Sequence, residues 1–246
     1  MYTHLIITRF NLDFSTIPSS DPCYSGYQRT AVWDKSREDH RLYLLENITG
    51  QTILSQTNKN FRWLLACNPN TSPELRHKLE LLSQKIGFTP YFIEPWLENI
   101  ANVGKNLCQK SGHDFLITTR LDADDGISTD FVALVQEEFC KQDFEFISFN
   151  LGLQKNLEDS EAFPFCYWGK STYNNFKSLI ERADNPKTVY CATLGIDCPT
   201  VRTINNIHPV WLKILHGDNV ATAHVDYPKN GENNELEAWF ITKNGG

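Results

Sequence analysis

The chain has 246 residues, of which 41% are hydrophobic and 22% charged, and this composition indicates a globular protein and excludes a disordered one. Its formal charge of −7, from 23 basic and 30 acidic residues, argues against a non-specific nucleic-acid binder, which normally carries a concentrated basic face. No stretch is apolar for long enough to cross a membrane, and Arg9 and Asn11 interrupt the start, where a signal peptide has its hydrophobic centre. We therefore expect one cytoplasmic domain over residues 1–246, without a nucleic-acid partner.

The first half of the chain alternates between strand-like and helix-like patterns. Apolar and β-rich runs predict strands at residues 2–10, 61–67, 89–94 and 114–121, and apolar residues at helical spacing predict helices at residues 37–56, 72–86 and 96–110. Ser72 followed by Pro73 is typical of a helix N-terminus. Such alternation predicts an α/β fold with a largely parallel sheet covered by helices, in which ligands bind beyond the carboxyl ends of the strands.

The pattern after residue 126 is less regular. Ser128 is placed to cap a helix whose apolar residues run from Phe131 to Phe139, and residues 144–149 form another predicted strand. Beyond residue 151 we expect a helix within residues 170–183, an extended segment at residues 188–192 and a short amphipathic segment at residues 208–216. One domain with two unequal halves fits this pattern best.

Three carboxylates lie in the turn that follows the fourth predicted strand. Asp122, Asp124 and Asp125 precede Gly126, and we call residues 122–126 the acidic turn. Carboxylates this close repel one another, and a proton or a hard divalent cation between them relieves the repulsion. An ordinary turn rich in Asp and Gly is the simplest alternative. We interpret the acidic turn as a metal and diphosphate site.

Two other kinds of acidic site compete with this interpretation. An EF-hand calcium loop starting at Asp122 needs glycine at its sixth position and glutamate at its twelfth, but these are Ile127 and Ala133. A phosphatase with an aspartate nucleophile stays open, although Thr118 and Thr119 make the preceding strand more polar than the buried strand expected behind such a nucleophile. A metal-dependent phosphohydrolase is therefore kept as an alternative.

Several stretches resemble glycosyltransferases of the GT-A fold. They are Thr-Arg-Phe-Asn at residues 8–11, Leu-Ser-Gln-Thr at residues 54–57, Asn-Phe-Arg-Trp at residues 60–63, and Thr-Arg-Leu-Asp-Ala-Asp-Asp at residues 119–125. Pro-Val-Trp-Leu-Lys-Ile-Leu-His-Gly-Asp-Asn at residues 209–219 narrows the resemblance to bacterial rhamnosyltransferases, over about residues 2–220. The resemblance implies a GT-A-like, Rossmann-related α/β domain with a mixed, mostly parallel sheet. Residues 1–125 would form its nucleotide-sugar-binding half and residues 126–246 its acceptor-side half.

The resemblance also implies roles for the acidic turn. In GT-A enzymes an Asp-x-Asp-type motif holds Mn²⁺ or Mg²⁺ between the two phosphates of a nucleotide-sugar donor. This implies that Asp124 or Asp125 contacts the metal, while Asp122 contacts the ribose or a metal-bound water. A histidine from the carboxyl-terminal half often adds a metal ligand, and His216 is the candidate.

Donor and acceptor contacts are expected from other side chains. Arg9 and Arg120 are candidates for binding the diphosphate or nucleotide, because guanidinium groups form paired, charge-assisted hydrogen bonds with phosphate. An inverting transferase needs an acidic side chain that takes the proton of the acceptor hydroxyl, and Asp197 and Asp218 are the candidate bases. A retaining mechanism would dispense with such a base, so the stereochemistry stays open.

The sequence thus predicts a metal-dependent glycosyltransferase. It would move a sugar, for which the family's name suggests rhamnose, from a nucleoside-diphosphate donor to a glycan or a lipid-linked acceptor. A lipid-linked acceptor would require peripheral contact with a membrane. The alternatives are the metal-dependent phosphohydrolase and a non-catalytic module that binds nucleotides or glycans.

Overall fold

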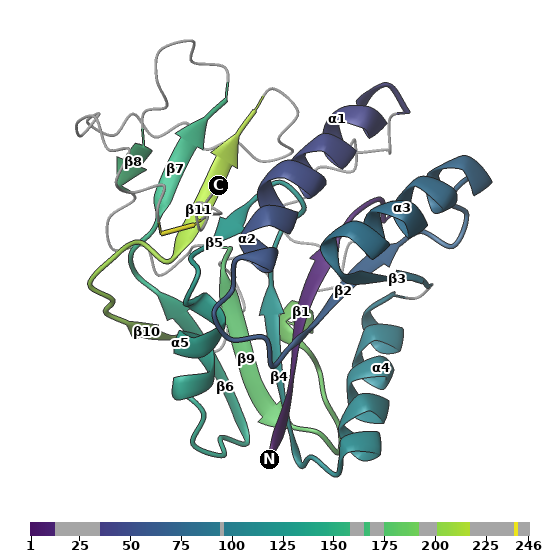
Figure 1. Ribbon diagram of the computed structural model, residues 1–246. Coiled ribbons are helices and arrows are strands. Elements are labelled where there is room, and N and C mark those ends of the chain that lie inside the picture. The colour runs from purple at the N-terminus through teal and green to yellow at the C-terminus, as the bar shows by residue number, and fades with distance from the viewer. Residues whose placement is uncertain are drawn as a thin grey trace.

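The computed structural model describes residues 1–12, 35–93, 96–157, 165–167, 175–191, 201–216 and 239–240. A seven-stranded sheet forms its centre (Figure 1). In the order β10-β6-β9-β4-β1-β2-β3, the strands are β10 (Val201–Ile204), β6 (Phe144–Phe149), β9 (Lys177–Arg182), β4 (Phe115–Arg120), β1 (Tyr2–Arg9), β2 (Arg62–Cys67) and β3 (Phe88–Phe92). All neighbours are parallel except β9, which is antiparallel to both β4 and β6. The α/β class and the mixed, mostly parallel sheet are therefore confirmed.

A smaller sheet lies beside the end of β4. It has the order β5-β11-β7-β8 and consists of β5 (Gly126–Ile127), β11 (Trp211–Leu215), β7 (Leu153–Asn156) and β8 (Phe165–Tyr167). β11 is antiparallel to β5 and parallel to β7. Because β5 begins directly after Asp125, this pairing brings β11 alongside the acidic turn.

The predicted helices of the first half form with small shifts at their ends. A continuous helical stretch comprises α1 (Glu38–Leu44), a π-helical segment (Leu45–Thr49) and α2 (Gly50–Leu54), and it is followed by α3 (Pro73–Ile86), α4 (Trp96–Ser111) and α5 (Phe131–Glu137). Ser72 caps α3 as expected, since its side chain accepts a hydrogen bond of 3.2 Å from the N–H of Leu75. Gly87 and Gly112 follow α3 and α4 with φ angles of 84° and 65°, which suit glycine.

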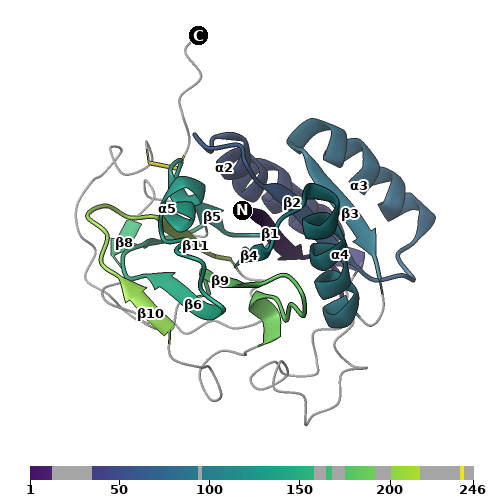
Figure 2. The same ribbon diagram turned by 90° about the horizontal axis from the view of Figure 1, so that it is seen from below.

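Alternating side chains of the central strands pack into two cores, one on each face of the sheet. Ile6, Leu65 and Ile117 belong to the core beneath α1, α2, α3 and α5. Their neighbours, such as Ile7 and Leu116, belong to the core that includes residues of α4 and of the short 3-10 helix η4 (Val189–Cys191). Figure 2 shows helices above and below the sheet. A sheet covered on both faces leaves the carboxyl ends of its parallel strands as the natural place for a ligand.

No helix within the described residues has both the length and the apolar character needed to cross a membrane.

Several expectations for the second half are wrong. Asp130, not Ser128, occupies the position before α5, and the Ser128 hydroxyl donates to the Asp130 carboxylate at 2.6 Å. In place of a helix, residues 177–182 form β9, while residues 170–174 lie outside the described part of the chain. Residues 189–191 form the helix η4, and residues 211–215 form the fully buried strand β11. Tertiary contacts override local preference here.

The polar residues of β9 explain how local sequence misled the prediction. Ser178 shares a hydrogen bond of 2.6 Å with Thr119 of β4. Glu181, only 2% exposed, accepts the N–H groups of Lys187 and Thr188 at 2.7 Å and 2.9 Å. Because these buried polar side chains have hydrogen-bond partners, β9 can occupy the middle of the sheet although its sequence is not that of an apolar strand.

Buried His4 links β1, β4 and α5 on the face of the sheet that α5 covers. His4 of β1 accepts a hydrogen bond at Nδ1 from the amide of Gln136 (3.1 Å), which leaves its Nε2–H to donate to Thr119 (2.9 Å). The Tyr2 hydroxyl donates to the Gln136 oxygen at 3.1 Å and thereby fixes the amide orientation. Burial lowers the pKa of His4 to about 3, so the ring is neutral in the folded protein.

This neutral ring should make stability depend on pH. The unfolded chain takes up a proton on His4 below its ordinary pKa of 6.5, whereas the folded protein resists it down to about 3. We therefore expect the free energy of unfolding of the wild type to fall between pH 6.5 and 4.5, by up to about 1.4 kcal/mol per pH unit from this residue. Urea unfolding at several pH values should show that the unfolding free energy of His4→Gln changes less with pH than that of the wild type. An equal pH dependence in both proteins would contradict the neutral state of His4.

Candidate active site

The acidic turn begins where β4 ends and is held from below by a helix. The N–H of Asp125 donates to the carbonyl of Asp122 at 3.3 Å and closes the turn. The Thr49 hydroxyl, from the π-helical segment, donates to the carbonyl of Asp125 at 2.8 Å. One turn further, the Thr52 hydroxyl accepts the N–H of Ile127 at 3.3 Å. The helix thus fixes the backbone on both sides of Gly126.

Gln56 continues this attachment beyond the end of α2. Its side chain is 2% exposed and donates to the carbonyls of Thr52 (2.9 Å) and Ser128 (2.6 Å). Its oxygen accepts the N–H of Val132 at 3.0 Å, in the first turn of α5. The Leu-Ser-Gln-Thr stretch therefore has a physical purpose: Gln56 ties the segment after the acidic turn to the helix before β2.

Asp122 faces a pair of arginines. Arg120 contacts both carboxylate oxygens, with its Nε at 3.2 Å and its Nη2 at 2.8 Å, and Arg9 approaches to 3.5 Å. The strand register explains this meeting, because Arg120 lies beside Ile7 in the parallel pair and Arg9 follows two residues later on the same face of β1. The alternation of side chains along β4 thus continues through Arg120, whose side chain lies on the same face of the sheet as that of Arg9.

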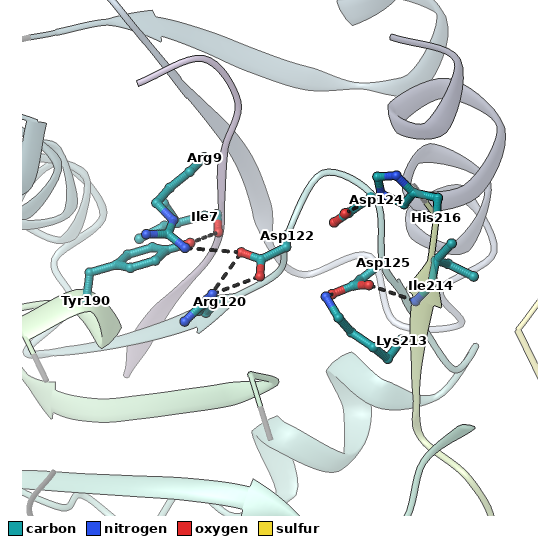
Figure 3. A network of polar contacts seen from close by, with 10 residues as sticks. All are labelled: Ile7, Arg9, Arg120, Asp122, Asp124, Asp125, Tyr190, Lys213, Ile214 and His216. Atoms are coloured by element: carbon teal, nitrogen blue, oxygen red, sulfur yellow. Dashed lines mark hydrogen bonds and ion pairs between the residues drawn. The ribbon is translucent and has the colours of Figure 1, made fainter. Parts of the chain in front are cut away.

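Tyr190 lies beneath both guanidinium groups. Its ring centroid is 5.0 Å from Cζ of Arg9 and 5.8 Å from Cζ of Arg120. Its hydroxyl donates to the carbonyl of Ile7 at 3.0 Å, and the residue is only 5% exposed. Figure 3 shows the tyrosine, the arginines and Asp122 as one group. The buried ring supports the arginines by cation–π contact and packing.

Asp124 faces the opposite direction and meets His216. Nε2 of His216 lies 2.8 Å from Oδ2 of Asp124. The side chain of Asp124 is 23% exposed, whereas that of His216 is 5% exposed. The imidazole of His40, from α1, makes an edge contact with the His216 ring at a centroid distance of 5.2 Å. Residues from three distant parts of the chain therefore meet on this side of Asp122.

Asp125 is fully buried and turns toward β11. Its Oδ2 accepts a hydrogen bond from the Lys213 ammonium at 2.9 Å, and its Oδ1 accepts the N–H of Ile214 at 2.9 Å (Figure 3). Both oxygens are thus engaged by one strand. The three carboxylates of the acidic turn point to three different sets of partners.

The charges of the site are strongly interdependent. Burial alone would raise the pKa of Asp122, but Arg120, Arg9 and Lys213 hold it well below its ordinary value. The pKa of Asp124 is also lowered, because Lys213 and His216 outweigh burial and the repulsion of Asp122.

Opposing influences act on the pKa values of Asp125 and Lys213, which form a buried pair. Burial raises the pKa of Asp125 to about 7 against the attraction of Lys213, whereas the three carboxylates raise the pKa of Lys213 despite its burial. We take the pair as ionised, because both the ammonium and the Ile214 N–H donate to the Asp125 carboxylate.

The site unites most of the residues predicted from the sequence. Arg9, Arg120, Asp122, Asp124, Asp125 and His216 all lie around the acidic turn. The candidate bases Asp197 and Asp218 lie outside the described residues. Lys213 and Tyr190 also belong to the site, although no sequence motif indicated either of them. Lys213 stood within a stretch used for the family resemblance, but only the β5–β11 register reveals its partner.

The polar residues of β4 do not count against a phosphatase. Thr118 and Thr119 do not interrupt a buried strand, because every residue of β4 is buried. The Thr118 hydroxyl accepts the N–H of Val189 at 2.8 Å, and Thr119 bonds to His4 and Ser178. The polarity of the strand therefore does not discriminate between the two kinds of site.

The geometry allows limited metal binding by the protein alone. Within the described part of the chain, no three side chains of the His, Cys, Asp and Glu types form a cluster that could hold a metal ion. Asp124 and His216 are adjacent, so they form a pair of candidate ligands. The arrangement can attract a phosphorylated ligand through the arginines and a cation through this pair.

The fold defines the class as α/β, with a charged site beyond the ends of parallel strands. The sequence also identifies the family, because the model of the family described as "Putative rhamnosyl transferase" matches residues 3–227. The chain belongs to this family. The predicted family is thereby confirmed, and with it the assignment to the glycosyltransferases. No curated protein matches the chain.

Similar solved structures are distant. TarS of S. aureus, in complex with UDP, is 11% identical, with 87% of this chain and 61% of the TarS chain covered and a TM-score of 0.42. A cytidylyltransferase from Leptospira borgpetersenii is 12% identical, with 74% and 60% covered and a TM-score of 0.31. The inositol-1-phosphate CTP transferase from T. maritima is 10% identical, with 96% and 94% covered and a TM-score of 0.32. The chain spans about three fifths of the first two, and these likenesses carry no functional argument.

Replacing Gln56 should loosen the segment that follows the acidic turn. Gln56→Leu leaves the Val132 N–H and the Ser128 carbonyl without their buried partner, and we expect the free energy of unfolding to fall by about 2–4 kcal/mol. Gln51→Leu, on the same helix, removes a single bond to the Glu46 carbonyl and should cost less than about 1 kcal/mol. Denaturant unfolding of both variants measures the difference, and similar losses would refute the role of Gln56.

Proposed function

We propose that the protein is a metal-dependent glycosyltransferase that uses a nucleoside-diphosphate sugar as donor. The observation that carries the proposal is the contact of Asp124 with His216 at 2.8 Å, beside the arginine pair held by Asp122. Family membership supplies the reaction class. The family's description suggests rhamnose as the sugar and thus a donor that carries it on a diphosphate.

The residues of this site suit a hard divalent cation. In octahedral Mg²⁺ sites the ligands lie about 2.1 Å from the metal, so two ligands at adjacent positions lie about 3 Å apart. The Asp124–His216 separation of 2.8 Å is close to that spacing. Mg²⁺ usually uses one or two protein ligands and completes its shell with waters and substrate phosphates, and Mn²⁺ accepts imidazole as well. A cluster of three protein ligands is therefore not required.

Charge balance supports the use of a cation. Asp122, Asp124 and Asp125 carry three negative charges, and Arg9, Arg120 and Lys213 carry three positive ones. These six charges balance one another, so a nucleoside diphosphate would add excess negative charge. A divalent cation at Asp124 and His216 would neutralise it and stabilise the leaving diphosphate as charge accumulates there.

The arginines are placed to bind the donor's diphosphate or ribose end. Arg120 donates to the Asp122 carboxylate and Arg9 forms an ion pair with it, which supports a role for both guanidinium groups in binding an oxygen anion. Asp122 fixes their orientation in the free protein, and Tyr190 packs against both. The donor would therefore meet arginines that lose little freedom on binding.

The acceptor and the base that activates its hydroxyl are proposals from the sequence alone. A glycan or a lipid-linked sugar is the proposed acceptor, and Asp197 and Asp218 are the proposed bases of an inverting reaction. Trp211 is fully buried against Phe176, so its ring is not available to stack on a sugar. Its indole N–H donates to the Phe149 carbonyl at 3.0 Å, so it is a core residue.

The metal-dependent proposal predicts that nucleotide affinity falls when the cation ligands are changed. Calorimetric titration with UDP, GDP and dTDP should show binding that requires Mn²⁺ in the wild type. Asp124→Asn and His216→Gln should each weaken it by at least about tenfold, equivalent to about 1.4 kcal/mol. The exposed Asp143→Asn, remote from the acidic turn at the start of β6, should bind like the wild type.

Three results would contradict the proposal. Nucleotide binding that is independent of Mn²⁺ and unchanged in Asp124→Asn would remove the metal from the donor site. Release of phosphate from simple phosphoesters without turnover of sugar nucleotides would favour the phosphohydrolase. Binding without hydrolysis or transfer of any donor across a broad panel would favour a non-catalytic module.

The geometry of the Arg9 and Arg120 side chains, as well as their charge, should contribute to the affinity for nucleoside diphosphates. Arg9→Lys and Arg120→Lys keep the positive charge but lose the planar pair of donors. We expect each to weaken nucleoside diphosphate binding about tenfold, because charge-assisted hydrogen bonds contribute about 1.5–3 kcal/mol. Arg202→Lys is the matched control, since Arg202 bonds to Glu145 through two nitrogens far from the site. Unchanged affinity in both site variants would exclude direct donor contact.

A further inference from the structure

Asp125 differs from the other two carboxylates of the acidic turn in its surroundings. Its side chain is completely buried, and each oxygen already accepts a hydrogen bond from β11. Asp122 and Asp124 retain side-chain exposures of 19% and 23%. A carboxylate with no exposed surface is poorly placed to bind a cation that also needs waters and donor phosphates.

The strand register explains why Lys213 reaches this carboxylate. β11 runs antiparallel to β5, with Trp211 beside Ile127 and Leu212 beside Gly126. Continued by one residue, the register places Lys213 beside Asp125, where the ammonium and the carboxylate lie 2.9 Å apart. The Ile214 N–H adds a second bond to the same carboxylate.

This attachment involves the two segments that carry the proposed cation ligands. Asp124 directly precedes Asp125, and His216 follows Ile214 by two residues on the chain leaving β11. β5 has only two residues, so its backbone ladder offers few hydrogen bonds to hold the segments together. A buried ion pair that also engages a backbone N–H adds the fixed geometry that this short ladder lacks.

We propose that Asp125 and Lys213 form a buried clamp that positions Asp124 against His216, and that Asp125 itself is not a ligand of the cation. The inference rests on the proposed function of the Asp124–His216 pair. It reassigns Asp125, which the sequence grouped with the metal ligands, to a positioning residue. Lys213 also lies near enough to Asp122 and Asp124 to offset their charges, and so it holds the acidic turn together before a cation or donor arrives.

A double-variant experiment separates a clamp from a ligand. Asp125→Asn keeps an oxygen for the Ile214 N–H but leaves the Lys213 ammonium without its counter-ion. Lys213→Met keeps a similar length but leaves Asp125 without its cation, and a buried charge that loses its partner is strongly destabilising. The double variant carries neither charge. Arg202→Met, which breaks an exposed ion pair remote from the site, is the control.

Two readouts are measured on the full chain: Mn²⁺ affinity by paramagnetic resonance, and the side-chain nitrogen resonances of His216 in isotope-labelled protein. A clamp predicts that each single variant weakens Mn²⁺ binding at least about tenfold and shifts the His216 resonances. The double variant should regain affinity to within about threefold of wild type, with His216 resonances near those of wild type. Arg202→Met should change neither readout.

A double variant that binds Mn²⁺ at least about tenfold more weakly than the wild type would show that Asp125 is a ligand and would overturn the clamp. The double variant decides this even where a single variant fails to fold. A wild type that binds no Mn²⁺, with or without UDP, would instead contradict the proposed function. The His216 resonances then still test the clamp: restoration in the double variant supports it, and resonances that stay shifted overturn it.

Discussion

The antiparallel pairing of β11 with β5 is the constraint on which the site depends. It joins a strand from late in the chain to Gly126 and Ile127 at the end of the acidic turn. The pairing thereby brings Lys213 and His216 to carboxylates that lie 88 and 92 positions earlier. The pairing is short, and the helix before β2 reinforces it by bonding to the backbone on the other side of the turn through Thr49, Thr52 and Gln56. The acidic turn is thus held between a helix and a strand.

Direction, more than proximity, distinguishes the three carboxylates. One turn presents Asp122 to the arginines, Asp124 to His216 and Asp125 to Lys213, so adjacent residues of the same type have different chemical surroundings. A tight turn makes this possible because successive side chains leave it in different directions. The mutual repulsion expected of crowded carboxylates is relieved by separate cationic or hydrogen-bonding partners.

The first half of the fold was predictable because its signals are local. Ser72 and Pro73 mark the start of α3, and apolar runs mark β1, β2 and β4. The second half was not, because β9 and β11 contain polar residues whose partners lie on other elements, such as Thr119 for Ser178. The three carboxylates of the acidic turn are adjacent in the sequence, but the different partners that they face depend on strand register, which the sequence does not show.

The position of β9 has a consequence for how the protein could evolve or be recombined. β9 comes from the second half of the chain but lies between β4 and β6, and the segment after it delivers Tyr190 to Arg9 and Arg120. A chimaera that exchanged residues 126–246 between two relatives would therefore replace the ring beneath the arginines, the lysine beside Asp125 and the histidine beside Asp124. Such an exchange would change several partners of the acidic turn at once, because the boundary between the halves passes through the site around that turn.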